Sequence, residues 1–237
     1  MSNLNLNIRE FNRFLNSLSK INNSAILEVD KDKMYSIINS EDRSLFLWAE
    51  LGGDFGINES LNLPSLPKLS NALDMIGTPD VIFEVSSNCL QYKGQGLKFK
   101  YHLYDDGILT KPKVTLSKIE SLTYDYEFEL GKGFVKTLLK NSSIFKDTNK
   151  LYIYTEDGHL VWSLADKTIP NTDAMTVIGD EVDFEMDEFI LNLDNMRLVD
   201  FGTENFLTFR INKNGIGSLL LHSDNLTLNY IISSLQK

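Results

Sequence analysis

Residues 8–21 read IREFNRFLNSLSKI and predict an amphipathic helix with one basic side. Arg9, Arg13 and Lys20 are spaced four and seven residues apart, so at about 100° per residue they share a stripe roughly 40° wide. A stripe of this kind on one side and apolar residues on the other predict a helix that packs on a core and presents positive charge outward. The apolar residues on the opposite side are Phe11, Phe14, Leu15, Leu18 and Ile21.

A second basic helix is predicted in residues 131–147, which read GKGFVKTLLKNSSIFKD. Lys132, Lys136 and Lys140 repeat every four residues and drift by only about 80° around the helix. The two basic segments lie about 120 residues apart in a chain of 237, which suggests a duplicated unit. In the segment 131–147, the apolar residues face away from the lysines; they are Phe134, Leu138 and Phe145.

The positive charge of this chain is local. The whole chain carries −10, whereas residues 8–21 carry +2 and residues 131–147 carry +3, which leaves −15 for the remainder. A general nucleic-acid binder is basic overall. Any contact with a polyanion is therefore expected only at the two basic helix sides.

Length and composition predict a globular protein with a real core. The chain is 42% hydrophobic, with 14 Phe and 9 Tyr, which argues against wholesale disorder. No apolar run approaches the roughly 18 residues that span a bilayer, and the N-terminus MSNLNLNIRE lacks the pattern of a secretory signal. Cys89 is the only cysteine, which excludes an internal disulfide and fits a reducing compartment. We expect a cytoplasmic protein with no membrane partner.

The order of predicted elements is the same in both halves of the chain. Helices are expected at 8–21 and 64–76 in the first half, and at 131–145 and 187–199 in the second. Residues 105–119 open with a turn signal, contain Pro112 and have no sustained period, so they read as an exposed connector. Strands are expected at 25–30, 34–39, 45–51, 61–63, 81–85, 89–93 and 97–104, and then at 124–130, 151–155, 160–164, 174–178, 182–184, 206–211, 218–222 and 226–233.

Internal duplication explains this order best. Aligned positions differ by 121 to 129 residues, so only small loop changes separate the halves. The predicted fold class is α+β, with similar domains at 1–104 and 120–237 joined by the connector at 105–119. The aligned pairs are Phe11 with Phe134, Leu61 with Val182, Val81 with Phe206, and Leu97 with Leu226.

The duplicated order and the two basic helix sides resemble the replicative DNA sliding clamps in their two-domain form. In particular, the chain looks like the tailed-phage clamps related to proliferating cell nuclear antigen. The resemblance covers the whole chain and rests on element order, size, acidity and helix charge, because no short motif matches residue for residue. It implies a polymerase processivity factor that needs no cofactor and catalyses nothing.

The resemblance further implies a homotrimeric ring whose four helices per subunit surround duplex DNA. The partners would be double-stranded DNA without sequence preference, a DNA polymerase, a clamp loader and two further copies of the chain. Neighbouring subunits would pair strand 97–104 with strand 174–178. A partner peptide would bind beneath the connector, near Ile108, Leu109 and Ile232. The DNA-facing residues would be Arg9, Arg13, Lys20, Lys68, Lys132, Lys136, Lys140 and Arg197.

The four helices differ in charge, so they are not expected to contribute equally. The fourth carries Arg197 among several carboxylates, and the second carries only Lys68 beside Asp74. DNA contact should therefore depend mainly on the first and third helices. If the protein is viral, it would act in the host-cell cytoplasm.

Two other classes of protein remain open. One is a viral structural or assembly protein built from duplicated β-rich domains. The other is a metal-dependent nuclease that uses Asp180, Asp183 and Glu185 from the acidic run DEVDFEMDE. In that run, however, Val182, Phe184 and Met186 alternate with the acids, which favours a half-buried strand. No catalytic signature or metal-ligand spacing appears, since His102, His159 and His222 lie far apart.

Overall fold

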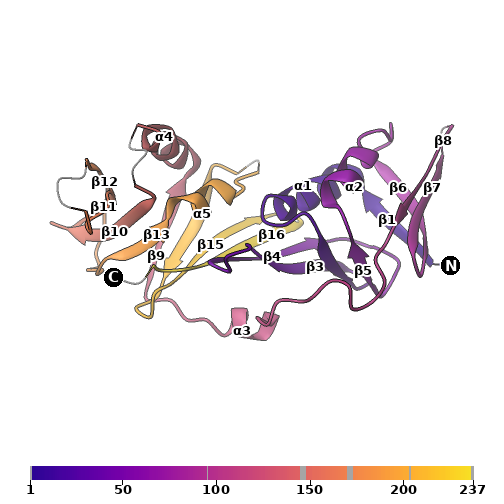
Figure 1. Ribbon diagram of the computed structural model, residues 1–237, viewed down its shortest axis with the longest axis horizontal. Coiled ribbons are helices and arrows are strands. Elements are labelled where there is room, and N and C mark those ends of the chain that lie inside the picture. The colour runs from indigo at the N-terminus through magenta and orange to yellow at the C-terminus, as the bar shows by residue number, and fades with distance from the viewer. Residues whose placement is uncertain (1, 95, 145–147, 170–172, 203, 236–237) are drawn as a thin grey trace. The chain divides into compact units, whose positions relative to one another are not determined.

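The structure is a computed structural model that describes residues 2–94, 96–144, 148–169, 173–202 and 204–235 (Figure 1). The chain divides into two compact units. Unit 1 consists of Met1–Leu122 with His222–Asn229, and unit 2 consists of Thr123–Leu221 with Tyr230–Lys237. Antiparallel strands and helices make up both units, which confirms the predicted α+β class.

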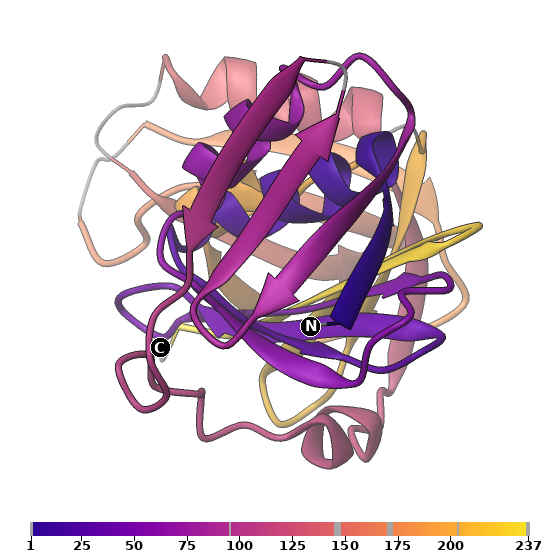
Figure 2. The same ribbon diagram turned by 90° about the vertical axis from the view of Figure 1, so that its right-hand side faces the viewer.

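Unit 1 begins with a strand–helix pair and continues as strands interrupted by a second helix. Its strands form a four-stranded sheet of order β1-β6-β7-β8, seen face-on in Figure 2, and a second set of neighbours in the order β5-β2-β3-β4. The elements are β1 (Ser2–Asn7), α1 (Ile8–Ser19), β2 (Ala25–Val29), β3 (Lys33–Asn39), β4 (Leu45–Gly52), β5 (Glu59–Leu63), α2 (Leu66–Leu73), β6 (Asp80–Ser86), β7 (Cys89–Gly94), β8 (Leu97–His102) and α3 (Leu116–Glu120).

Helix α1 forms as its sequence predicts. Asn7 caps it, because the side-chain oxygen accepts a hydrogen bond from the Glu10 N–H at 3.2 Å. The apolar side is buried: Phe14 and Leu15 are fully inaccessible to solvent. Burial of these side chains is the main force that holds the helix on the strands. On the other side of the helix, Arg9 and Lys20 are exposed to solvent.

Strand β1 is an element that the sequence analysis did not assign. Leu4 and Leu6 point into the core and Asn5 lies between them, which is the alternation of a half-buried strand. The strand pairs antiparallel with β6, with Leu4 opposite Phe83. The strand is rich in asparagine, a residue with low strand propensity, although its two leucines alternate as a half-buried strand requires.

Unit 2 repeats this plan element for element. The order in unit 1 is β1, α1, β2 to β5, α2 and β6 to β8. The order in unit 2 is β9, α4, β10 to β13, α5 and β14 to β16. The strand neighbours also correspond, with β12-β11-β10-β13 as one four-stranded sheet and β9, β14, β15 and β16 following the same order as β1, β6, β7 and β8. The elements are β9 (Tyr126–Gly131), α4 (Lys132–Ser142), β10 (Lys150–Glu156), β11 (His159–Leu164), β12 (Met175–Glu181), β13 (Phe189–Asn192), α5 (Leu193–Leu198), β14 (Phe206–Ile211), β15 (Ile216–Ser223) and β16 (Leu226–Ser233).

The fourth predicted helix is wrong in its first half. Residues 187–199 were expected to be helical, but Phe189–Asn192 forms β13, which pairs with β10, and only Leu193–Leu198 is helix. The strand predicted at 182–184 is also wrong, because these residues lie in a loop. The counterpart of β5 is therefore β13, and the alignment of Leu61 with Val182 is incorrect.

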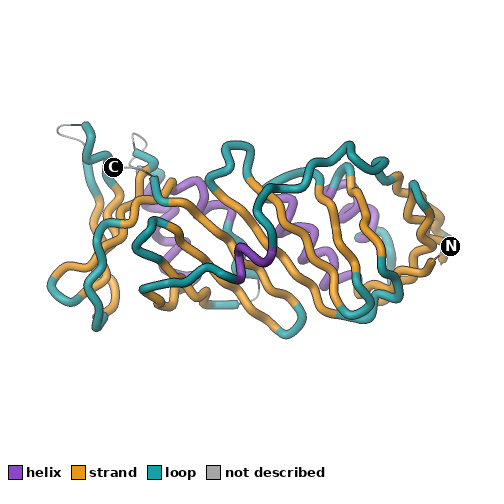
Figure 3. Tube along the Cα trace, turned by 90° about the horizontal axis from the view of Figure 1, so that it is seen from below, coloured by secondary structure: helices purple, strands orange, loops and turns teal. Residues whose placement is uncertain are grey.

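The connector crosses the face of β2 and β3 that is turned away from α1 and α2 (Figure 3). It contains one short helix, α3, which the sequence analysis did not predict. Ile119 anchors this helix by burying all but 4% of its surface. The start of the connector is held by Asn62, whose Nδ2 donates to Asp106 Oδ1 at 2.9 Å.

The core of unit 2 is built around one tryptophan. The Trp162 ring lies 5.1 Å from the ring of Phe134 and 6.0 Å from that of Phe128. Phe209 and Phe189 continue the cluster, and Gly217 leaves room for both. Phe134 therefore packs inward from α4, as its position opposite the lysines predicts.

Candidate nucleic-acid interface

The basic stripe of α1 is only partly free. Arg9 and Lys20 are exposed, as expected for a stripe opposite the core. Arg13 lies between them but is half-buried, and its Nη1 donates to Ser223 Oγ at 3.2 Å. Its Nε and Nη2 are closed off from solvent and have no hydrogen-bond partner among the described residues. Arg13 therefore presents less of its charge to a ligand than the exposed Arg9 does.

Two asparagines of α1 fix the position of this helix on α2. Asn12 Nδ2 donates to Asp74 Oδ1 at 2.7 Å, and Asn16 Oδ1 accepts from the Ser70 hydroxyl at 3.1 Å. Both side chains therefore face the neighbouring helix, and their hydrogen bonds fix the direction in which the basic stripe of α1 points.

Lys68 is exposed near the start of α2, and a buried tyrosine helps to place it. Ser65 caps the helix by accepting from the Lys68 N–H at 3.4 Å. The Tyr101 hydroxyl donates to the Ser65 carbonyl at 2.8 Å and accepts from the Ser65 N–H at 2.9 Å. Burial raises the pKa of Tyr101 to about 12, so this hydroxyl keeps its proton and both hydrogen bonds at neutral pH.

In α4 the three lysines are not equivalent. Lys136 and Lys140 are exposed. Lys132 is half-buried, and its Nζ donates to the Gly202 carbonyl at 2.7 Å, so it ties the start of α4 to the loop after α5. Phe145, which was expected on the apolar side, lies outside the described residues, as do Lys146 and Asp147.

Arg197 in α5 is exposed but pairs with a carboxylate of its own helix. Its Nη1 donates to Asp194, three residues earlier. Such an exposed pair is weak, yet it neutralises part of the charge that a phosphate would meet. Of the eight predicted DNA-facing residues, the exposed ones besides the paired Arg197 are Arg9, Lys20, Lys68, Lys136 and Lys140.

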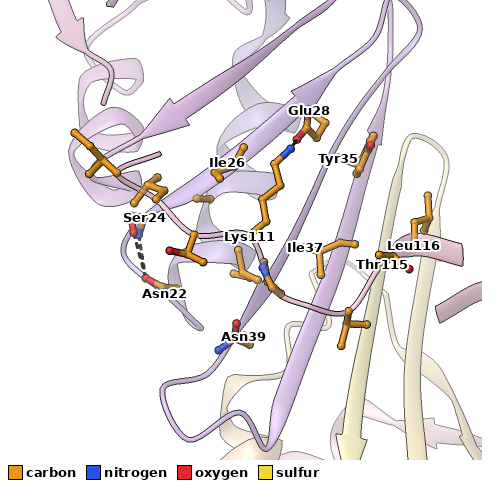
Figure 4. Close-up of a pocket in the computed structure, with 17 residues that line it drawn as sticks. Asn22, Ser24, Ile26, Glu28, Tyr35, Ile37, Asn39, Lys111, Thr115 and Leu116 are labelled. Carbon is orange, nitrogen blue, oxygen red and sulfur yellow. Dashed lines mark hydrogen bonds and ion pairs between the residues drawn. The ribbon is translucent and has the colours of Figure 1, made fainter. Parts of the chain in front are cut away.

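The connector and the strands beneath it enclose a groove of about 380 Å³ in unit 1 (Figure 4). Ile108 and Leu109, both predicted to bind a partner peptide, line it. Ile232 does not line this groove, because it is fully buried in β16. The consecutive apolar residues Tyr230, Ile231 and Ile232 are typical of a strand that is covered on both faces.

Two strands stand at sheet edges with contrasting charge. Strand β8 is an edge of its sheet in unit 1 and exposes Lys98 and Lys100. Strand β12 is an edge of its sheet in unit 2 and exposes Asp180 and Glu181, together with Ile178, which is 70% exposed. Exposed edges of this kind are templates for pairing with another strand.

The acidic run does not assemble a metal centre. Within the described residues no group of three or more His, Cys, Asp or Glu side chains is placed to hold an ion. Asp183 and Glu185 instead line an open groove with Lys213, and the Phe184 ring packs 5.2 Å from that of Tyr126. The helices that the structure describes include none long and apolar enough to cross a membrane.

Comparison with known proteins identifies the fold. No protein-family model and no curated protein sequence matches the chain. PCNA from A. fulgidus, solved with the C-terminal region of FEN-1 bound, is similar over 100% of this chain and 99% of its own, with 12% identity and a TM-score of 0.76. PCNA from Thermococcus kodakaraensis matches over 99% of this chain and 100% of its own, at 13% identity and a TM-score of 0.75.

A bacterial protein has the same architecture in a longer chain. The DNA polymerase III beta subunit from Thermotoga maritima matches over 100% of this chain at 12% identity and a TM-score of 0.70. The match covers 65% of the beta subunit, so this chain spans about two thirds of that protein. The chain has the two-domain sliding-clamp fold.

Proposed function

We propose that this chain is the subunit of a DNA sliding clamp, which encircles duplex DNA and tethers a replicative DNA polymerase. The observation that carries the proposal is the clamp fold with exposed cations on the equivalent helices α1 and α4 of an otherwise acidic chain. A surface that is acidic elsewhere repels DNA, which favours contact at these helices alone.

The DNA contact in this proposal is diffuse. Long side chains such as those of Lys136 and Lys140 attract phosphates without reading base edges. Non-specific contact of this kind has Kd values of about 10⁻⁴–10⁻⁶ M, which permits sliding. Retention on DNA would then come from the closed ring. Arg13, Lys132 and Arg197 contribute less, because each already has a partner within the chain.

Ring closure is proposed to use the two exposed strand edges. Pairing of β8 from one copy with β12 from the next would satisfy backbone groups on both edges. The lysines of β8 would meet the carboxylates Asp180 and Glu181, and Ile178 would leave solvent. Three copies joined in this way would form the homotrimer that the resemblance to PCNA-type clamps implies.

The partner site is proposed to be the connector groove lined by Ile108 and Leu109. A polymerase and a clamp loader would dock there through short apolar segments. By the same resemblance, the protein would be a tailed-phage clamp that works in the host cytoplasm and performs no catalysis. The part of the prediction that concerns Ile232 is not carried forward, since that side chain is buried.

Topological retention on DNA tests the proposal. The protein is mixed with circular plasmid, and a carbodiimide joins neighbouring lysines and carboxylates, including those of the paired edges. The complex is then washed at about 1 M salt, where the Debye length is about 3 Å and phosphate contacts are screened. We expect protein to remain on the circle and to leave once the plasmid is cut. Equal loss from circular and linear DNA would contradict the proposal.

A further inference from the structure

The connector groove already holds a side chain. The side chain of Lys111, a connector residue, extends across the groove to Glu28 on β2. Its ammonium group pairs with Glu28 Oε1 (Figure 4). The groove therefore already accommodates an alkyl chain that ends in a positive charge.

The Lys111 ammonium helps to keep the carboxyl group of Glu28 ionised. Its Oε1 is closed off from solvent, and its Oε2 accepts a hydrogen bond from Ser60. Burial alone would raise the pKa of Glu28, but the hydrogen bonds from Lys111 and Ser60 outweigh burial and hold the pKa below its usual value. The carboxylate is thus charged at neutral pH, and a positive side chain in the groove stabilises this charge.

Apolar side chains from both β strands and the connector line part of the groove around the ion pair. On the strands, Ile26 lies two residues before Glu28, Tyr35 pairs with Glu28, and Ile37 lies farther along β3 (Figure 4). The connector contributes Leu109 and Val114 to the opposite wall. A bound segment with apolar side chains next to one basic side chain would match the apolar residues and the carboxylate of this groove.

Lys111 is held loosely enough to be replaced. Its side chain is 63% exposed, and exposed ion pairs contribute little stability. Between Leu109 and Val114 the connector makes no backbone hydrogen bond to any residue that the structure describes. The connector is anchored on either side of this stretch, by Asp106 and by Ile119, so the middle can move while its ends stay in place.

We propose that Lys111 occupies the groove as an internal substitute for a partner, and that the partner is a peptide segment with a lysine or arginine flanked by apolar residues. The basic side chain of the partner replaces Lys111 at Glu28, and Lys111 turns to solvent. The inference rests on the proposed function only in taking the connector groove as the partner site. A peptide without a basic residue would have to leave Lys111 in place and bind over it.

Selection of random peptides displayed on phage tests this inference with the intact chain. Peptides that bind the wild-type protein should be enriched in lysine or arginine beside leucine, isoleucine or phenylalanine. Their affinity should fall about five-fold in Glu28→Gln and rise about two- to five-fold in Lys111→Ala, because competition from Lys111 is removed. Lys113→Ala is the matched control, since Lys113 is an exposed lysine of the same connector that does not line the groove.

Three results would overturn the inference. The first is selection of peptides without basic residues, or of none above the background of the library. The second is unchanged affinity in Glu28→Gln, and the third is identical behaviour of Lys111→Ala and Lys113→Ala. The experiment uses neither DNA nor polymerase, so a protein that is retained on circular DNA but fails here keeps the proposed function and loses only this inference.

Discussion

Neutralising the exposed lysines of α4 should change how DNA affinity depends on salt. Lys136→Gln with Lys140→Gln removes two positive charges that have no ion-pair partner among the described residues and lie on one side of the helix. Both substitutions keep a polar side chain of similar length at an exposed helical position, so the fold should be unaffected. The helix should lose phosphate contacts and nothing else.

The size of the effect follows from counterion release. Each phosphate contact contributes about −0.9 to the slope of log K against log salt, so two contacts contribute about −1.8 per copy of the chain. A four-fold rise in salt should weaken the wild-type protein about twelve-fold more than the variant for each copy engaged. An effect of that size is well above the error of a binding titration.

Fluorescence anisotropy with a labelled DNA duplex, repeated across a salt series, measures this slope. The matched control is Lys113→Gln with Lys118→Gln, which removes two exposed charges from the connector, on the face of the strands away from α1 and α2. We expect the control to keep the wild-type slope. Equal slopes for the wild type and the α4 variant, or an equal drop in both variants, would refute the assignment of α4 to the DNA.

Three further outcomes are expected. Lys132→Gln should lower the free energy of unfolding by about 1 kcal/mol by removing the bond to Gly202 and should leave the salt slope unchanged, whereas a slope reduced by about 0.9, half of the change in the α4 variant, would show that Lys132 contacts DNA after all. Tyr101 has its pKa raised to about 12 by burial, so its contribution to stability is complete below the unfolded value of about 10 and is lost as the pH rises from there toward 12. Urea unfolding in that range should therefore depend less on pH in Tyr101→Phe, and parallel curves would contradict this. Gly217→Ala should destabilise the protein by about 1–3 kcal/mol in thermal or urea unfolding, because the added carbon would lie 2.9 Å from Phe189 Cζ and 3.0 Å from Phe209 Cε2; a wild-type midpoint would argue against this packing.

The helices and strands that the sequence predicted well are those with one buried side. In α1, the spacing of Phe11, Phe14 and Leu18 is enough to place both the core and the exposed stripe. The same reasoning failed at Phe189, Ile190 and Leu191, which are all buried. A short run that is covered on both sides has no period, so the spacing of Phe189 and Leu193 imitated a helix.

The sequence predicted which helix sides carry the basic residues, but not which of these residues already have partners within the chain. Helical spacing correctly put Arg13 and Lys132 on the basic sides, yet no local pattern could reveal that Ser223 and Gly202 hold them. These partners lie 210 and 70 residues away along the chain. Lys111 is a similar case, because its role depends on Glu28 across the groove. Tertiary contacts of this kind decide which charges remain available to a ligand.

The mass of the protein in solution tests the central claim most directly. A ring of three copies requires about three times the 27.0 kDa of one chain. Sedimentation equilibrium at micromolar concentration should give that mass, and reversal of Lys98 and Lys100 to glutamate should reduce it by opposing the carboxylates of β12. A stable 27.0 kDa monomer under the same conditions would contradict the ring.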